Sequence, residues 1–99
     1  MINFHEFNEM MNRSSKGTVS VISRGTLRVS RMIGGGTLAQ VSEAVREFED
    51  EVRSDVGEDG EVGEATLESG YGIVVSSYVR CQDALTFIEK LRGAGWKSK

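Results

Sequence analysis

Two β-hairpin patterns, each followed by a helical pattern, dominate the sequence of this 99-residue chain. The first hairpin is predicted over 18–33, where stretches rich in β-branched residues flank Arg24-Gly25. The second is predicted over 64–80, with Gly70-Tyr71-Gly72 at its turn. Hairpins joined by helices favour an antiparallel sheet with helices on one face, so the expected fold class is α+β.

Three helices are predicted: a short one that begins at Asn3, a long one over 38–54 and a last one over 82–92. In the long helix, apolar residues recur at the spacing that packs one helix face on a sheet; they are Leu38, Val41, Ala44, Val45, Phe48 and Val52. The last helix is predicted to carry Ala84, Leu85, Ile88 and Leu91 inward. The predicted order is α-β-β-α-β-β-α, with a four-stranded, mainly antiparallel sheet.

Within the first hairpin, we expect a three-residue connection, 24–26, because it places Val21 opposite Val29 and keeps apolar residues on one face. The opposite face would carry Ser20, Ile22, Arg28, Ser30, Thr66, Glu68, Val74, Ser76 and Tyr78. Its apolar members allow a homodimer joined through the sheets. Overlaying the hairpins at an offset of 46 suggests a ββα unit used twice. The chain is read as a single domain, 1–99, with a flexible acidic loop at 55–64 and a short C-terminal tail at 96–99.

Composition excludes several classes of function. The chain is 38% hydrophobic and 27% charged, as in a soluble globular protein, and has no apolar run near the roughly 20 residues that span a bilayer. The first residues lack the pattern of a signal peptide, so we expect a cytoplasmic protein without membrane contact. With one cysteine, Cys81, and one histidine, His5, neither a disulfide nor a zinc site of the usual kind can form within the chain. We expect no metal, no cofactor and no enzymatic activity.

Two local motifs invite a ligand and are interpreted structurally. The run Gly34-Gly35-Gly36 precedes a helix start, where backbone N–H groups can bind an anion. Its spacing fits no phosphate loop, and Thr37 with Gln40 predicts a capping box that would occupy those N–H groups. We therefore predict a tight strand-to-helix corner.

The acidic segment that begins at Asp55 has a glycine, Gly60, at the sixth position, as a calcium loop requires. Position three is Gly57 and position twelve is Thr66, so two ligands are missing. A solvated loop is the prediction.

Charge is distributed unevenly along the chain, whose net charge is −3. Residues 13–31 contain five basic side chains and no acidic one, whereas 43–68 contain eleven acidic side chains and two arginines. Such asymmetry is typical of a protein with a charged partner. The first hypothesis is a protein-binding module, in the sharper form an inhibitor of a basic, nucleic-acid-binding protein. Its predicted contact residues are Glu43, Glu47, Asp50, Glu51, Asp55, Glu58, Asp59 and Glu61.

The alternative hypothesis uses the basic hairpin, which could lie along a phosphate backbone. Its contact residues would be Lys16, Arg24, Arg28 and Arg31. In a regular strand, Arg28 and Arg31 point to opposite faces, and no aromatic residue lies on this hairpin for a base to stack on. The sequence therefore favours a protein partner over nucleic acid.

Overall fold

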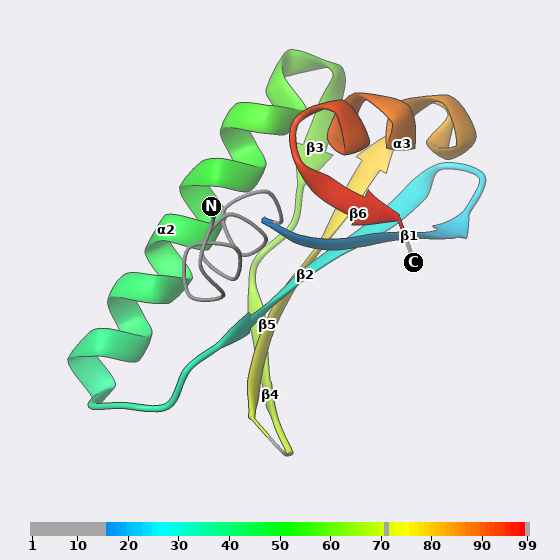
Figure 1. Cartoon of the computed structure of the whole chain (residues 1–99). Coiled ribbons are helices and arrows are strands. Elements are labelled where there is room, and N and C mark those ends of the chain that lie inside the picture. The colour runs from blue at the N-terminus through cyan, green and yellow to red at the C-terminus, as the bar shows by residue number, and fades with distance from the viewer. Residues whose placement is uncertain (1–15, 71, 99) are drawn as a thin grey trace, which may run out of the picture.

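The computed structural model describes residues 16–70 and 72–98, so the helix predicted at Asn3 and the side chain of His5 lie outside the described residues. The described elements are β1 (Gly17–Ser23), β2 (Thr26–Ile33), α2 (Leu38–Val56), the 3₁₀ turn η1 (Gly57–Asp59), β3 (Gly60–Val62), β4 (Thr66–Ser69), β5 (Ile73–Cys81), α3 (Ala84–Gly93) and β6 (Trp96–Ser98) (Figure 1).

The sheet is six-stranded and mixed, so the prediction of a four-stranded, mainly antiparallel sheet is wrong. Its strand order is β3-β5-β2-β1-β6, and β4 also pairs with β5. Both additional strands come from segments expected to be irregular. The predicted loop, 55–64, contains the end of α2, η1 and β3, and the predicted tail contains β6, which pairs in parallel with β1.

The predicted tail becomes a strand because Trp96 is pulled into the core, where its side chain is 2% exposed. This burial brings Trp96 opposite Gly17, which has no side chain and a φ of +148°. A Cβ on Gly17 would lie 2.7 Å from the Trp96 ring. Close backbone approach at this glycine therefore admits β6 to the sheet edge.

β3 and β4 share one edge of β5 and are separated by a bulge. Val62 is opposite Val79, and Thr66 is opposite Ser76, so four steps along one strand match three along the other. The Gly63 N–H donates to the Tyr78 carbonyl oxygen at 2.8 Å within this interval. The extra residue interrupts the regular pairing along the edge of β5. This interruption is why β3 and the residues after it were predicted as a loop.

The β1–β2 register also differs from the prediction. Val21 pairs with Leu27, not with Val29, because the turn is the two residues Arg24-Gly25 and an irregularity between Val21 and Ser23 absorbs one residue. Odd-numbered residues still oppose odd-numbered ones, so the apolar side chains remain on one face as the pattern requires.

Helices α2 and α3 both pack on that face and enclose the core (Figure 1). Phe48 of α2 meets Trp96 edge to face, with ring centroids 5.9 Å apart, between β6 and the helix. Leu38 is 83% exposed and Leu85 is 69% exposed, so their predicted core positions are wrong. The first turns of α2 diverge from the strands (Figure 1), so Leu38 is too far from the sheet to pack on it.

The two halves of the chain are not a plain ββα repeat. Two observations agree with the predicted offset of 46. The first residues of α2 and α3, Leu38 and Ala84, are 46 positions apart, and Ser30 pairs with Ser76. However, α2 has 19 residues and α3 has 10. The strands that follow also differ, since β3 pairs antiparallel with β5 and β6 pairs parallel with β1.

Candidate interaction surfaces

The basic and acidic segments of the sequence neutralise each other across the fold. Lys16 Nζ lies 2.9 Å from Asp55 Oδ2, and Arg31 Nη2 lies 2.5 Å from Glu51 Oε2. Arg28 approaches Glu68 more loosely, at 3.9 Å. Three of the four basic residues predicted to bind nucleic acid are thus paired with the acidic segment. The uneven charge of the sequence does not become two separate charged poles.

Two of these pairs belong to a network that fastens α2 to β1 and β6. Asp55 Oδ2 accepts hydrogen bonds from Lys16 Nζ and from Trp96 Nε1, both at 2.9 Å. Arg31 Nε donates to the Lys16 carbonyl oxygen at 2.6 Å. The Arg31 guanidinium also lies over the Phe48 and Trp96 rings, 5.6 and 5.4 Å from their centroids. This network therefore stabilises the fold, and it already uses the charged groups of Lys16, Arg31, Glu51 and Asp55.

Only part of the predicted acidic contact surface stays available. Glu43, Glu47 and Asp50 are exposed, and the four- and three-residue spacing places them on one side of α2. None of the three forms an ion pair with another described residue. We call these three residues the α2 acidic stripe. Glu58 and Glu61 are also exposed but lie past the helix, in η1 and β3, where Glu61 is opposite Arg80.

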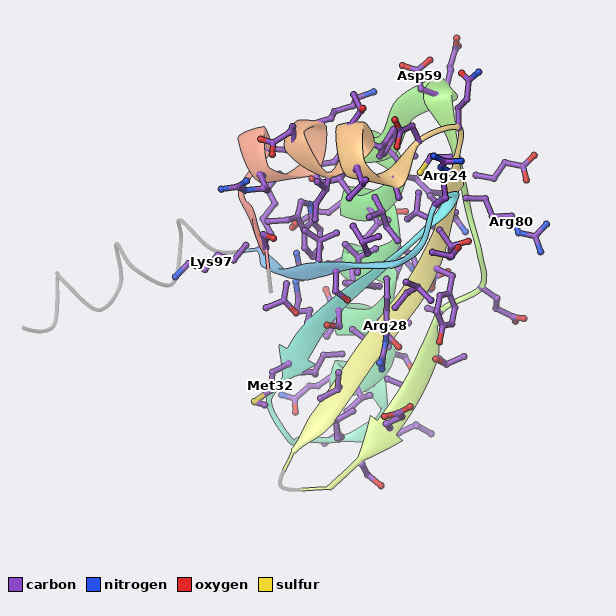
Figure 2. The ribbon with its side chains drawn as sticks, turned by 90° about the vertical axis from the view of Figure 1, so that its right-hand side faces the viewer. Arg24, Arg28, Met32, Asp59, Arg80 and Lys97 are labelled. Atoms are coloured by element: carbon purple, nitrogen blue, oxygen red, sulfur yellow. The ribbon has the colours of Figure 1, made fainter. Side chains whose placement is uncertain are left out.

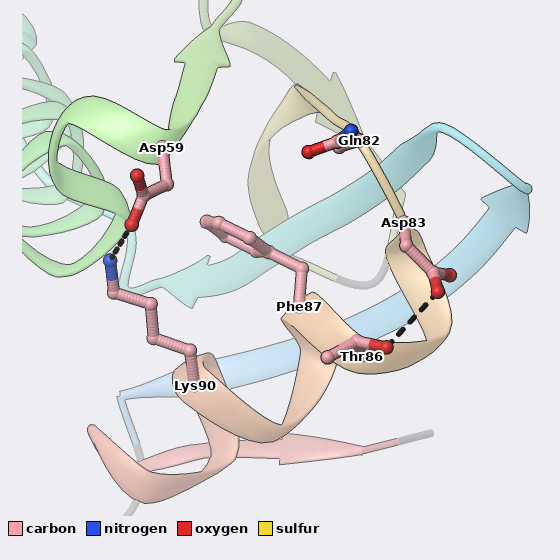
Figure 3. Close-up of a pocket in the computed structure, with 6 residues that line it drawn as sticks. All are labelled: Asp59, Gln82, Asp83, Thr86, Phe87 and Lys90. Atoms are coloured by element: carbon pink, nitrogen blue, oxygen red, sulfur yellow. Dashed lines mark hydrogen bonds and ion pairs between the residues drawn. The ribbon is translucent and has the colours of Figure 1, made fainter.

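The remaining predicted acid, Asp59, lines a shallow hollow between η1 and α3 with Gln82, Asp83, Thr86, Phe87 and Lys90 (Figure 3). Lys90 Nζ lies 3.5 Å from Asp59 Oδ2, donates to the Val56 carbonyl oxygen at 3.0 Å and sits over the Phe87 ring. Asp83 caps α3 by accepting from the Leu85 N–H and the Thr86 hydroxyl. Lys90 thus binds the last carbonyl group of α2, and Asp83 caps the first turn of α3.

A second surface is the sheet face that is turned away from both helices, which we call the open face. The register brings together Thr18, Ser20, Arg28, Ser30, Thr66, Glu68, Val74, Ser76 and Tyr78 on it. Figure 2 views the strands with α2 behind them and shows Arg28 over the middle of the sheet. Sequence patterns identify most of this face but do not show that Arg28 and Tyr78 are direct cross-strand neighbours.

The glycine run turns the chain from β2 into α2, and a capping box occupies two N–H groups at the helix start. The Thr37 hydroxyl accepts from the Gln40 N–H at 3.2 Å, and Gln40 Oε1 accepts from the Thr37 N–H at 3.0 Å, so the predicted capping box is confirmed. A Cβ on Gly36 would collide with Gln40 Oε1. None of the three glycines has a positive φ, so only Gly36 has a steric reason to be glycine.

The cysteine Cys81 lies at the end of β5 and is half-buried. Burial raises the pKa of the Cys81 thiol, and the negative charge of Asp83 raises it further, so the thiol is protonated at neutral pH. No three His, Cys, Asp or Glu side chains of the described part converge to hold a metal ion. The prediction of a solvated loop that begins at Asp55 is wrong, because this segment forms the end of α2, the turn η1 and the strand β3.

No protein-family model, curated protein or solved structure matches this chain. Neither of the two helices in the described part is long and apolar enough to cross a membrane.

Proposed function

We propose that this protein is a small, non-enzymatic, cytosolic module that binds a basic surface of another protein through the α2 acidic stripe. In its sharper form, the partner is a nucleic-acid-binding protein whose groove the stripe occupies. Glu58 and Glu61 would extend the contact past the end of the helix. Glu51, Asp55 and Asp59 are left out because their carboxylates are paired within the chain.

One observation carries the proposal: the stripe is exposed and has no cation partner among the described residues, while other carboxylates of the same segment do. At about 1.5 Å of rise per residue, Glu43 and Asp50 are separated by roughly 10 Å along the helix axis. Three like charges on one rigid helix create a directional negative field. Such a field steers a basic partner and favours its association at low ionic strength.

The test is a pull-down from a cell lysate in which nucleic acids have been digested with nuclease. The bait is the wild-type chain or the triple variant Glu43→Lys, Glu47→Lys, Asp50→Lys. We expect a specific basic protein to be retained by the wild type and lost from the variant, because the field at the contact is reversed. Moderate salt should release that protein, since exposed charge pairs are screened.

A control of equal charge reverses three exposed carboxylates elsewhere, Glu64→Lys, Glu68→Lys and Glu89→Lys, of which Glu68 and Glu89 form surface ion pairs with Arg28 and Arg92. Its change in net charge is the same as that of the stripe variant. If both triple variants lose the partner equally, net charge and not the stripe is responsible, and the proposal is wrong. Retention of the partner by the stripe variant would contradict it as well.

A further inference from the structure

We infer that the open face binds single-stranded nucleic acid, with Arg28 and Tyr78 at the centre of the contact. This goes beyond the proposed protein contact, because the open face is formed by strands whereas the stripe lies on α2. It also replaces the basic hairpin predicted from sequence, since Lys16 and Arg31 are held in the network on the helix-covered face.

Arg28 is the first reason. It lies in a cross-strand row between Ser20 of β1 and Tyr78 of β5. Its Nε is buried and has no hydrogen-bond partner among the described residues, and its Nη2 lies 3.9 Å from Glu68 Oε1. About a third of the side chain stays exposed. A ligand cannot reach the buried Nε, but the Nη groups form no hydrogen bond with another described residue, and phosphate oxygens are acceptors of matching geometry.

Tyr78 is the second reason. Its side chain is 50% exposed although it lies directly beside Arg28 in the sheet. An exposed ring next to an arginine is a platform on which an unpaired base can stack. Bases of a duplex are already stacked on each other, so this platform selects a single strand.

The surroundings of this pair complete the surface. Arg80 lies two residues further along β5 on the same face, and Lys97 is opposite Thr18 on β6. Figure 2 shows Arg80 and Arg24 toward one end of the sheet and Lys97 toward the other side. Between them a row of hydroxyls crosses four strands, Thr18, Ser30, Ser76 and Thr66. Ser76 is buried, and the hydroxyls pair with each other as Thr18–Ser30 and Thr66–Ser76, so this row supports the sheet beneath the proposed contact.

By register, the open face carries three cations, Arg28, Arg80 and Lys97. They outnumber the two carboxylates on the same face, Glu61 and Glu68. A polyanion complements such a face, whereas a second copy would bring like charges together. Nucleic acid is therefore favoured over a homodimer as the occupant.

The experiment measures fluorescence anisotropy of a labelled twelve-residue oligothymidylate titrated with the full chain at 50 mM NaCl. Arg28→Gln should weaken binding at least tenfold and Arg28→Lys less. Tyr78→Ala should weaken it roughly fivefold to a hundredfold, while Tyr78→Phe keeps the ring and the affinity. With about three phosphates neutralised, raising NaCl to 200 mM should weaken binding roughly twentyfold. The control Arg53→Gln replaces an exposed arginine of α2, away from the open face, and should change the affinity less than twofold.

Three results would overturn the inference: no binding up to 100 µM protein, affinity unchanged by Arg28→Gln, or tighter binding of a duplex of the same length. A dimer in light scattering that Tyr78→Ala dissociates would assign the open face to a second copy instead. Circular dichroism of each variant verifies folding. The stripe variant with three lysines should bind the oligonucleotide at least as well as the wild type, so this inference and the protein-binding proposal fail independently.

Discussion

Adjacent serines of β5 show how one side chain can be buried with or without a hydrogen bond. Ser76 points to the open face, where its hydroxyl lies 3.4 Å from that of Thr66. Ser77 points to the helices, is 1% exposed and has no hydrogen-bond partner among the described residues. A buried hydroxyl without a partner lowers stability, because it loses water and gains nothing in return.

Replacing Ser77 by alanine should therefore stabilise the protein. We expect Ser77→Ala to raise the free energy of unfolding by about 1 kcal/mol, because the desolvation penalty disappears. Ser76→Ala is the matched control and should leave that free energy unchanged or lower it by up to about 1 kcal/mol. Urea titration followed by tryptophan fluorescence measures both. A loss of stability in Ser77→Ala would mean that the hydroxyl has an acceptor after all.

At the scale of elements, Asp55 connects three pieces of the chain that are far apart in sequence. It belongs to α2, and its carboxylate accepts from Lys16, just before β1, and from Trp96 at the start of β6. The Asp55 side chain is 15% exposed, so water replaces these bonds poorly. β6 is only three residues long, and its attachment depends on Trp96 being held.

Asp55→Ala should lower the free energy of unfolding by about 2–3 kcal/mol, because it leaves the buried Trp96 N–H and the Lys16 ammonium without their acceptor. Asp55→Asn keeps an acceptor for Trp96 and should cost about half as much. The exposed Asp50→Ala should stay within about 0.5 kcal/mol of the wild type. Denaturant unfolding gives the ranking, and hydrogen exchange at β6 localises the effect. Equal stability of the Asp55→Ala and Asp50→Ala variants would refute the role assigned to Asp55.

At the scale of the whole molecule, charge segregation along the sequence becomes charge pairing in space. Residues from the basic segment meet residues from the acidic one at Lys16–Asp55, Arg31–Glu51 and Arg28–Glu68. Fewer charged side chains stay without an ion-pair partner among the described residues than the sequence indicates. They include the stripe on α2 and, on the open face, Arg80 and Lys97.

The arginines predicted from sequence as one binding group should therefore differ in how much each contributes to the free energy of unfolding. Arg31→Gln should lower the free energy of unfolding by about 2 kcal/mol, because it removes a charge-assisted hydrogen bond and the packing over two aromatic rings. Arg24→Gln, at the exposed hairpin turn, should change it by less than about 0.5 kcal/mol. Both are measured by urea titration at the same ionic strength. Similar losses for the two variants would contradict the division.

How far the candidate surfaces were predictable differs from residue to residue. Glu43, Glu47 and Asp50 stand on a regular helix, where spacing alone determines which side chains share a side. Asp55, Glu51 and Asp59 look equivalent to them in sequence, yet their cation partners are 39, 20 and 31 residues away. Arg28 and Arg31 were expected on opposite faces because side chains alternate along a strand. Their partners depend on the strand order.

The sequence by itself determined the elements that arise from local periodicity and local hydrogen bonding: the first hairpin, α2 with its Thr37 capping box, β5 and α3. Only the tertiary structure decided that β3 and β6 join the sheet and that most of the predicted basic residues pair with the acidic segment. The reason is physical. Short strands such as β6 have little intrinsic preference and form when a distant edge accepts their hydrogen bonds and a core accepts Trp96. Ion pairs likewise depend on distances in space, which local patterns do not contain.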